Sequence, residues 1–496
     1  MKKLLLLFAL WSIGIAGSFA DGNFSYIDWR GVKWSCSPVY DADGKVVPSQ
    51  VEITAASGYG TEVYVPETVY DRDWSDLSTE GVPYTVVKLA GVFAGSTKLQ
   101  KVTLPTSVTS LNRTFYECTA LTTVENTSQI TEVGDKSFLA VSITSIDLSS
   151  CTAVGDWAFG ACTSLTSINL PVCASIGKDA FYGCTSLTSI NMPVCTAVGD
   201  WAFGGCTALT TIDLPLCTAV GDDVFAGCTS LTSVPLSSYT SVGAGAFSGC
   251  TGLTTIDLPL CEAVGDGAFG GCTGLTSVKL PSCKSVGAYA FSTQYDKDEA
   301  CTALTYIELP ACESIGNYAF KDCTGLTFIN LPACTAIGDN AFEYCSGLTS
   351  VNMPLCTTIG FQAFRDCTSL ASIYIPSCVT SIGQSAFLFC SGLTQVYVSW
   401  NTPIGIDTTY FTGVDKQKCT LYVPEGTLDK YKSAYGWNEF ENIMWYDVTG
   451  IDNASVAVGA AETARYSANG QRVAAPVKGL NIVKYSDGST RKVVVK

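Results

Sequence analysis

Residues 158–179 read AFGACTSLTSINLPVCASIGKD, and close copies of this stretch recur along most of the 496-residue chain. The dipeptide Ala-Phe, with one Val-Phe variant, returns every 22 residues except for one step of 29 and one of 23; it stands at Phe159, Phe181, Phe203, Phe225, Phe247, Phe269, Phe291, Phe320, Phe342, Phe364 and Phe387. Looser copies surround Phe93, Phe115, Phe138 and Phe411. A unit this short cannot bury a core of its own, so successive units must stack on one another as a solenoid.

The order of residues within one unit predicts how each coil is built. The spacing L-x-x-I-x-L over residues 165–170 is the strand signature of a leucine-rich repeat. Alternate residues of a strand face opposite sides, so the Ile and the last Leu should point inward and their neighbours outward. Pro171 lacks an N–H and should end the strand, Gly177 should start the return side, and Phe181 should fill the interior. The fold class expected is therefore a β-rich solenoid of about 14–15 coils.

This unit has a family resemblance. The pattern A-F-x-x-C-x-x-L-x-x-I-x-L-P followed by I-G resembles the BspA-type leucine-rich repeat of bacterial surface proteins, over roughly residues 91–424. The chain departs from that pattern in one respect, because a second Cys stands in each unit within L-P-x-C-x-x-[IV]-G. The resemblance implies a secreted or cell-surface binding protein, adhesin-like in role, that contacts proteins or glycans of a host or of neighbouring cells.

The N-terminal ninety residues lack the repeat. Residues 1–20 combine two lysines, an apolar run and small residues before Ala20, which is typical of a signal peptide and predicts a mature chain that begins at Asp21 with no transmembrane segment. Residues 21–90 contain three β-rich runs and should form a cap on the first coil. The solenoid itself is expected over residues 91–446, and it should close with a short helix that begins after Thr427 and stops at Gly436.

The C-terminal segment, residues 447–496, differs in charge from the rest of the chain. Residues 465–496 hold seven Lys or Arg and one Asp, whereas the chain as a whole has a net charge of −16. Asn469-Gly470 and Asp487-Gly488 are hairpin-turn dipeptides between β-rich runs. The segment resembles a C-terminal sorting domain of the type IX secretion route, which implies the secretion machinery as a partner and the bacterial outer cell surface as the location. The alternative is a small structural β domain.

Composition argues against several classes of function. The chain contains no His, the commonest general base and metal ligand, and it has neither a C-x-x-C pair nor a glycine-rich phosphate loop. We therefore expect no catalytic residues, no cofactor and no metal. A strongly acidic chain also makes nucleic acid an unsuitable partner. Paired carboxylates could still serve a carbohydrate-active enzyme, but nothing in the repeat singles out a pair.

The 24 Cys mostly follow two ladders. One ladder stands three residues after the core Phe, at Cys162, Cys184, Cys206, Cys228, Cys250, Cys272, Cys323, Cys345, Cys367 and Cys390. The other follows the strand, at Cys151, Cys173, Cys195, Cys217, Cys261, Cys283, Cys312, Cys334, Cys356 and Cys378, and Tyr239 interrupts it. Equivalent side chains of stacked coils point the same way, which fits disulfide geometry poorly. We expect free, buried thiols that act as small apolar residues.

The outward strand residues form the natural ligand surface. They are mostly Ser, Thr, Asn and Asp, but the second half of the array adds four aromatic residues, which are the ligand-binding candidates: Tyr306, Phe328, Tyr374 and Tyr397. The first two occupy equivalent positions of neighbouring coils, as do the last two, so each pair should lie about 5 Å apart and stack. The alternatives are an ordinary solvated sheet and, for the whole protein, a structural spacer of the cell envelope without a specific ligand.

Overall fold

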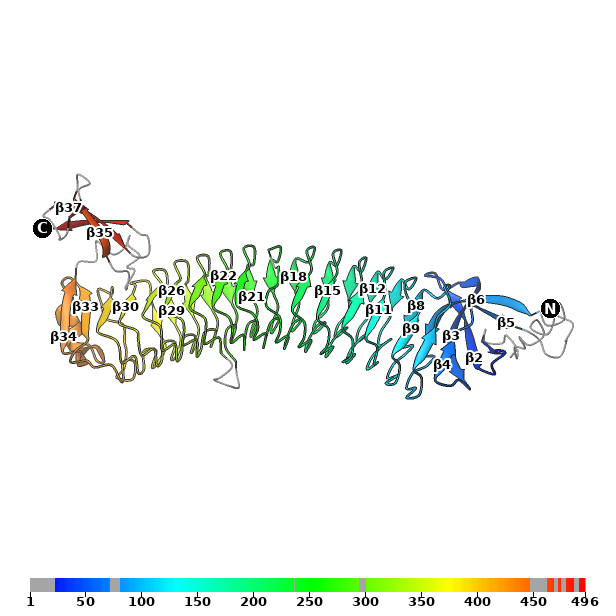
Figure 1. Cartoon of the computed structure of the whole chain (residues 1–496). Coiled ribbons are helices and arrows are strands. Elements are labelled where there is room, and N and C mark those ends of the chain that lie inside the picture. The colour runs from blue at the N-terminus through cyan, green and yellow to red at the C-terminus, as the bar shows by residue number, and fades with distance from the viewer. Residues whose placement is uncertain are drawn as a thin grey trace. The chain divides into compact units, whose positions relative to one another are not determined.

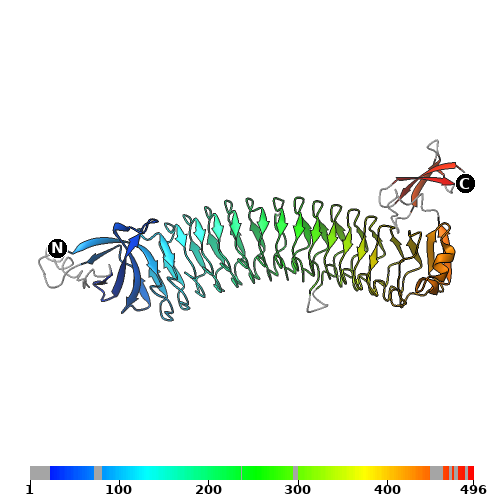
Figure 2. The ribbon, with the colours of Figure 1, turned by 180° about the vertical axis from the view of Figure 1, so that it is seen from behind.

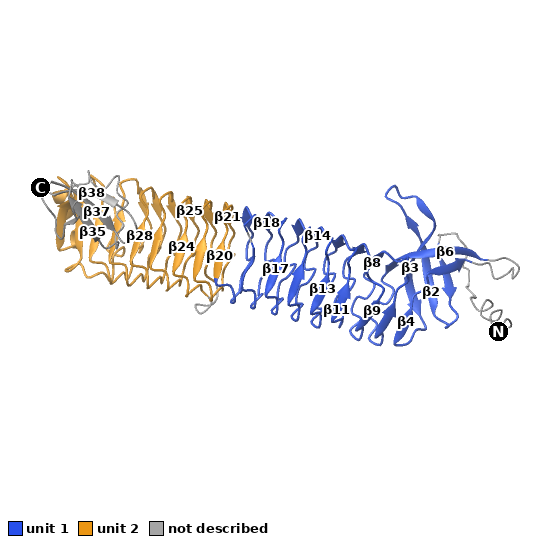
Figure 3. Cartoon of the chain, turned by 45° about the horizontal axis from the view of Figure 1, so that its top comes forward, with its two compact units in different colours: residues 1–254 blue, residues 255–496 orange. Residues whose placement is uncertain are grey.

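The structure is a computed structural model, and it confirms the predicted β solenoid. It describes residues 23–71, 81–235, 237–293 and 300–446, and the backbone of four strands within residues 462–495. The predicted signal peptide lies outside these residues. The chain divides into two compact units, residues 1–254 and residues 255–496 (Figure 3). The repeat makes about 16 turns rather than 14–15, because strands at both ends of the repeat region add turns of their own.

Unit 1 begins with a β cap that is continuous with the repeat. Its strands are β1 (Phe24–Ile27), β2 (Lys33–Tyr40), β3 (Val46–Ser57), β4 (Glu62–Tyr64), β5 (Thr68–Asp71) and β6 (Val82–Ala90). β1, β2 and β3 pair antiparallel, whereas β6 runs parallel to both β3 and β8 (Ser110–Asn112). β5 pairs antiparallel with β6, and β4 runs parallel to β7 (Lys101–Thr103). The cap thus gives the first repeat turn a hydrogen-bonded neighbour, which protects an otherwise open strand edge.

The later turns of unit 1 add strands to two ladders, except that the turn of Ser233 adds only an isolated bridge to one of them (Figures 1 and 2). The three-residue strands, which we call the strand face, are β9 (Thr123–Glu125), β11 (Ser145–Asp147), β13 (Ser167–Asn169), β15 (Ser189–Asn191) and β17 (Thr211–Asp213). The two-residue strands of the return side are β10 (Glu132–Val133), β12 (Ala153–Val154), β14 (Ser175–Ile176), β16 (Ala197–Val198), β18 (Ala219–Val220) and β19 (Ser241–Val242). Pairing is parallel between equivalent residues, as for Ser145 and Ser167.

Unit 2 repeats this arrangement. Its strand face comprises β20 (Thr255–Asp257), β22 (Ser277–Lys279), β24 (Tyr306–Glu308), β26 (Phe328–Asn330), β28 (Ser350–Asn352), β30 (Ser372–Ile375), β32 (Gln395–Val398), β33 (Thr420–Pro424) and β34 (Asn442–Tyr446). Its return side comprises β21 (Ala263–Val264), β23 (Ser285–Val286), β25 (Ser314–Ile315), β27 (Ala336–Ile337), β29 (Thr358–Ile359) and β31 (Ser381–Ile382). The strands from β30 to β34 lengthen and form one continuous four-stranded parallel sheet.

A short helix and a small sheet follow the last turns. Helix α2 (Leu428–Ser433) begins after Thr427 as expected, although the Thr427 hydroxyl donates to the Pro424 carbonyl at 2.7 Å instead of capping the helix. The helix ends at Ser433, so the predicted stop at Gly436 is wrong; Gly436 precedes a 3-10 turn, η2 (Trp437–Glu439). The C-terminal strands β35 (Glu462–Ser467), β36 (Arg472–Val473), β37 (Gly479–Tyr485) and β38 (Thr490–Val495) pair antiparallel, and the turns that join them lie outside the described residues.

One Phe per turn forms the centre of the core. The rings stack in series, with neighbouring centroids 5.0–5.7 Å apart in unit 1 and 5.0–5.5 Å apart in unit 2. All of these side chains are fully buried or nearly so. Each aromatic pair contributes about 0.5–1.5 kcal/mol beyond the area it buries. The stack sets one ring in each turn whatever the length of the turn, since Phe291 and Phe320, 29 residues apart, still stack with centroids 5.0 Å apart.

The return side holds successive turns in close backbone contact. The Gly177 N–H donates to the Val154 carbonyl at 2.8 Å. A Cβ at residue 177 would lie 2.6 Å from the carbonyl carbon of Gly155 in the preceding turn. Only glycine fits such an approach, which is why the I-G pair marks the start of the return side in the sequence.

Candidate functional site

Tyr306 and Phe328, the first predicted pair, are both exposed on the strand face of unit 2. Their exposed fractions are 49% and 40%, which makes them the most accessible rings of that face between β20 and β32. The Tyr306 hydroxyl points toward the carboxylate of Glu308, 3.5 Å away. No ring contact joins Tyr306 to Phe328 among the described side chains, since β24 ends one group of paired strands and β26 begins another. The two rings therefore offer separate contact points and not one stacked platform.

Tyr374 and Tyr397, the second predicted pair, belong to a larger aromatic cluster. They are register partners across β30 and β32, and both are half-buried. The Tyr397 ring stacks on Tyr422 of β33, with centroids 4.5 Å apart and planes at 8°, and meets Tyr446 of β34 edge-on at 5.6 Å. Burial raises the pKa of Tyr397. The cluster thus lies on the four-stranded sheet β30-β32-β33-β34, whose strands are the longest of the strand face of unit 2.

Hydrogen bonds fix the rings of this cluster. The Ser399 hydroxyl donates to the Tyr374 hydroxyl at 2.9 Å and lies 2.8 Å from the Tyr446 hydroxyl, which itself donates to the Val398 carbonyl at 3.1 Å. Sequence reasoning missed Tyr422 and Tyr446, because the 22-residue spacing lapses after Phe411. The apolar alternation of Thr420–Pro424 and Asn442–Tyr446 was the signal that could have found them.

Two small residues of the predicted outward column are buried. Ser350 and Ser372 have exposed fractions of 3% and 4%, although their register places them on the outer side of the strand face. Ser350 pairs directly with Phe328. An outward register position therefore does not by itself make a residue of this column accessible.

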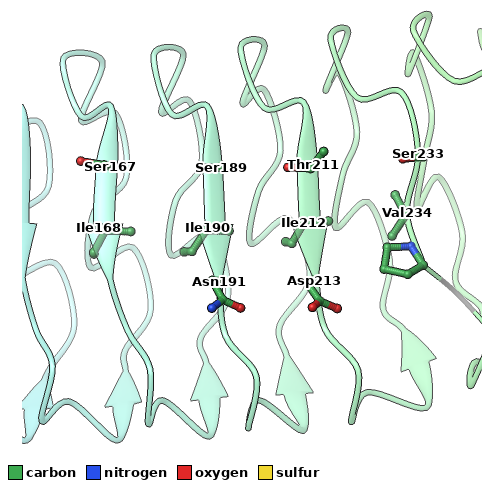
Figure 4. A pocket seen from close by; sticks show the side chains of 11 residues that line it. Ser167, Ile168, Ser189, Ile190, Asn191, Thr211, Ile212, Asp213, Ser233 and Val234 are labelled. Carbon is green, nitrogen blue, oxygen red and sulfur yellow. The ribbon is translucent and has the colours of Figure 1, made fainter.

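Unit 1 carries an open groove of about 880 Å³ on its strand face. Figure 4 shows Ser167, Ser189, Thr211 and Ser233 in a row across four successive turns, with Asn191 and Asp213 in the row below. Pro235 also lines the groove, and because it cannot donate a ladder hydrogen bond the turn of Ser233 forms only an isolated bridge with Thr211. Hydroxyl, amide and carboxylate groups at one spacing per turn could bind sugar hydroxyls or an extended peptide backbone.

The expectation that the thiols form no disulfides is confirmed. None of the 24 Cys forms a disulfide, and all are buried except the half-buried Cys378. In the ladder after the core Phe, the Cys184 thiol donates to the Phe159 carbonyl at 3.1 Å; in the other ladder the Cys312 thiol donates to the Ser314 carbonyl at 3.2 Å. Burial raises the pKa of Cys312 to about 12. Such thiols stay protonated at neutral pH, so they pack the core and do not act as nucleophiles.

The described residues carry neither a metal cluster nor a membrane-spanning helix. Among the described residues, no group of three or more Cys, Asp or Glu side chains is placed to hold a metal ion. Within the same part of the chain, no helix is long and apolar enough to cross a membrane.

Comparison with known proteins gives one family. The model of the BspA type leucine rich repeat region, with six copies, matches residues 90–193, 174–296 and 299–416. No curated protein sequence matches the chain.

Several solved structures are similar to this chain. A leucine-rich repeat protein from Bacteroides ovatus is 20% identical, with 83% of this chain and 98% of that chain covered and a TM-score of 0.48. A leucine rich cell surface protein from Faecalibacterium prausnitzii is 21% identical, covering 85% and 94%, with a TM-score of 0.38. The pneumococcal vaccine antigen PcpA is 16% identical, covering 84% and 97%, with a TM-score of 0.40.

Proposed function

Since the chain belongs to the BspA-type leucine-rich-repeat family, we propose that it is a binding protein of the bacterial cell exterior, adhesin-like in role, whose strand face contacts proteins or glycans of a host or of neighbouring cells. The observation that carries this proposal is the aromatic strand face of unit 2, where Tyr306 and Phe328 are exposed and Tyr397 is held in a stack. Exposed rings on a rigid support remove much apolar area from water at a low entropic cost.

The first experiment identifies a ligand and then tests the face. The chain from Asp21 onward is applied to an array of glycans and extracellular matrix proteins, and the strongest ligand is titrated against variants. Tyr306→Ser with Phe328→Ser should weaken binding by at least about tenfold with no change in thermal midpoint, since both rings are exposed. A matched control, Val172→Ser with Val194→Ser, removes two exposed apolar side chains outside the strand face and should change affinity by less than about twofold.

Two outcomes would count against this assignment. If the double aromatic variant kept both its affinity and its stability, the strand face of unit 2 would not be the binding surface. If the chain bound no member of the array, the result would favour the alternative, a structural spacer of the cell envelope. One observation favours that alternative. The hydroxyls of Thr166, Thr188 and Thr210 donate to carbonyls of the preceding turn at 2.9, 3.4 and 3.1 Å. These hydrogen bonds stiffen the array and leave the hydroxyls without a donor for a ligand.

We further propose that residues 1–20 direct export and that the C-terminal segment, residues 447–496, acts as a type IX sorting domain. The support is the basic composition of this segment and its antiparallel order β36-β35-β37-β38. A chain that ends at Ala464 should be exported but absent from the cell surface, as measured by fractionation and surface proteolysis. Normal surface display of that chain would make the segment a structural β domain.

A further inference from the structure

A second surface of unit 1 lies on the turns that carry the core Phe, away from the strand face. The residue two places before each core Phe forms a column along these turns, and in unit 1 the column alternates between indole and carboxylate: Trp157, Asp179, Trp201 and Asp223. All four have a left-handed backbone, with φ between 54° and 58°. The column thus sets one carboxylate-bearing turn between two indole-bearing turns.

Backbone hydrogen bonds hold this column in register. The Trp157 N–H donates to the Lys178 carbonyl at 2.9 Å, and the Asp179 N–H donates to the Asp200 carbonyl at 3.0 Å. Each residue of the column is therefore bound to the turn that carries the next one, about 4.8 Å further along. Asp179 consequently lies between the backbones of Trp157 and Trp201.

Tyr182, in the same turn as Asp179, places a third aromatic ring between the two indoles. Its ring centroid lies 5.5 Å from that of Trp157 and 6.0 Å from that of Trp201, with planes tilted by 61° and 67°. The position after the core Phe is Gly160 in the preceding turn and Gly204 in the following one, and a Cβ at either would come within 2.7 Å of an indole carbon. These glycines let both indoles lie against the backbone of their own turns.

Asp179 is buried without a partner. The residue is 6% exposed, its carboxylate oxygens still reach solvent, and they make no hydrogen bond or ion pair within the described chain. Its neighbours differ, because the carboxylates of Asp156 and Asp200 accept backbone N–H groups at 2.8 and 3.1 Å. Burial raises the pKa of Asp179, an effect that Lys178 opposes and Asp156 and Asp200 reinforce. Buried carboxylates normally have a cationic or hydrogen-bonding partner.

Unit 2 contains the same chemistry with its cations supplied by the chain itself. On the equivalent turns, the Arg365 guanidinium lies over the Tyr344 ring at 5.3 Å and pairs with the buried Glu343 at 3.0 Å. Lys321 likewise lies over Tyr344 at 5.6 Å and pairs with Asp322 at 2.9 Å. Aromatic rings beside buried carboxylates therefore hold cations in unit 2, whereas the carboxylate of Asp179 in unit 1 forms no ion pair within the described chain.

We refer to Trp157, Asp179, Tyr182 and Trp201 together as the turn-edge site. We propose that the turn-edge site binds a cationic side chain, a guanidinium or an ammonium, on an extended segment of a partner protein. The electron-rich ring faces and the carboxylate both attract a cation, and the surrounding Asp residues raise its local concentration. The turn-edge site does not overlap the strand face, so the outcome of its test is independent of the function proposed above.

The spacing of the column indicates the form of the partner. Asp179 and Asp223 stand two turns apart, about 9.6 Å along the stack. Three residues of a polyproline II segment advance about 9.3 Å and return to the same face. A segment with basic residues at positions i and i+3 could thus place one cation at each carboxylate, on either side of the Trp201 ring.

The test uses the full chain and two short peptides. Acetyl-Arg-Pro-Pro-Arg amide and the uncharged acetyl-Gln-Pro-Pro-Gln amide, each carrying an uncharged dye, are titrated by fluorescence anisotropy at physiological salt. We expect the Arg peptide to bind and the Gln peptide to bind at least about tenfold more weakly. Equal binding of the two peptides, or no binding of the Arg peptide, would overturn the proposal.

Variants then locate the binding. Asp179→Asn should lower the affinity for the Arg peptide at least about tenfold. Tyr182→Gly, which copies the glycine of both neighbouring turns, should lower it about threefold to tenfold. The matched control is Asp257→Asn, which removes an exposed carboxylate from the strand face outside the groove of unit 1 and should change affinity by less than about twofold. An equal loss in Asp257→Asn would mean that diffuse acidity, and not the turn-edge site, holds the peptide. Because two variants probe the site independently, a folding defect in one leaves the other to decide.

Discussion

The two units carry buried carboxylates on the same turns, but they neutralise them differently. In unit 2, Glu343 and Asp322 are 4% and 8% exposed, and each is paired with a cation of the chain. In unit 1, Asp179 is 6% exposed and has no such partner in the described structure. The carboxylates also stand at different positions of the turn, since Asp179 precedes its core Phe by two residues whereas Glu343 and Asp322 follow theirs by one and two. A paired carboxylate serves the stability of the fold, whereas an unpaired one reduces stability and is retained where it can serve binding.

The largest expected effect should be equal in the two units, because their cores are equivalent. Phe203 stacks between Phe181 and Phe225 in unit 1, and Phe342 between Phe320 and Phe364 in unit 2, and both are fully buried. Phe203→Ala and Phe342→Ala should each reduce the free energy of unfolding by about 3–5 kcal/mol. Hydrogen exchange followed by mass spectrometry would measure the loss turn by turn. A markedly smaller loss in one unit would show that the two cores differ.

The next effect should appear in unit 2 only. Arg365→Leu leaves the Glu343 carboxylate buried without its guanidinium and should cost about 1–3 kcal/mol at neutral pH, measured by chemical unfolding. Arg365→Lys keeps the charge and should recover part of that loss. Burial already raises the pKa of Glu343 in spite of Lys321 and Arg365. Protonation of Glu343 would therefore reduce the loss of stability in Arg365→Leu as pH falls. A loss of stability that did not change with pH would contradict the ion-pair explanation.

The corresponding change in unit 1 should have the opposite sign. Asp179→Asn removes an unpaired buried charge and should raise the free energy of unfolding by up to about 1 kcal/mol at pH 7. The pKa of Asp179 is raised in the folded chain, so the folded state holds this proton more tightly than the unfolded state does. In the wild-type chain, the stability gained from protonated Asp179 is consequently lost as pH rises through the pKa of the folded state. The higher free energy of unfolding of Asp179→Asn should therefore vanish at acidic pH. Destabilisation by Asp179→Asn would instead reveal a structural partner for the carboxylate.

The smallest effect concerns thiol reactivity, and it should not distinguish the units. Burial raises the pKa values of Cys162 in unit 1 and Cys301 in unit 2 to about 12. Iodoacetamide should therefore label few thiols of the native chain, with the half-buried Cys378 reacting first, as read by peptide mass spectrometry. After denaturation without a reductant, most thiols should react. Blocked thiols in that sample would mean disulfides between turns and would contradict the free-thiol structure.

The fold was predictable because its determinants recur in sequence. The L-x-x-I-x-L spacing predicted strands such as Ser167–Asn169, where exposed, buried and exposed residues alternate. Regular spacing also predicted the Phe stack, since equivalent residues of a solenoid must meet. Prediction failed where burial depends on neighbouring turns, as at Ser350, which is 3% exposed although its register places it outward beside Phe328.

The candidate sites were less predictable for the same reason. Tyr306 and Phe328 were identified by strand position, but their lack of a mutual ring contact depends on how β24 and β26 pair. The turn-edge site escaped sequence reasoning because it requires a left-handed backbone at Trp157 and a glycine at Gly160 to lay the indole down. Neither condition follows from hydrophobic periodicity, which records only whether a residue faces inward.

The one long step in the repeat shows how this architecture tolerates new sequence. The seven extra residues between Phe291 and Phe320 enter beside a closed turn: the Cys301 N–H donates to the Phe291 carbonyl at 3.1 Å, as the Cys184 N–H does to Phe181 in a turn of ordinary length. The Cys301 thiol also reaches the Phe269 carbonyl at 3.2 Å. The turn is closed by its two anchor residues, whatever their separation along the chain. A gene encoding such a protein can acquire a foreign segment at this point, or gain and lose whole 22-residue modules by recombination, while each surviving turn keeps its neighbours.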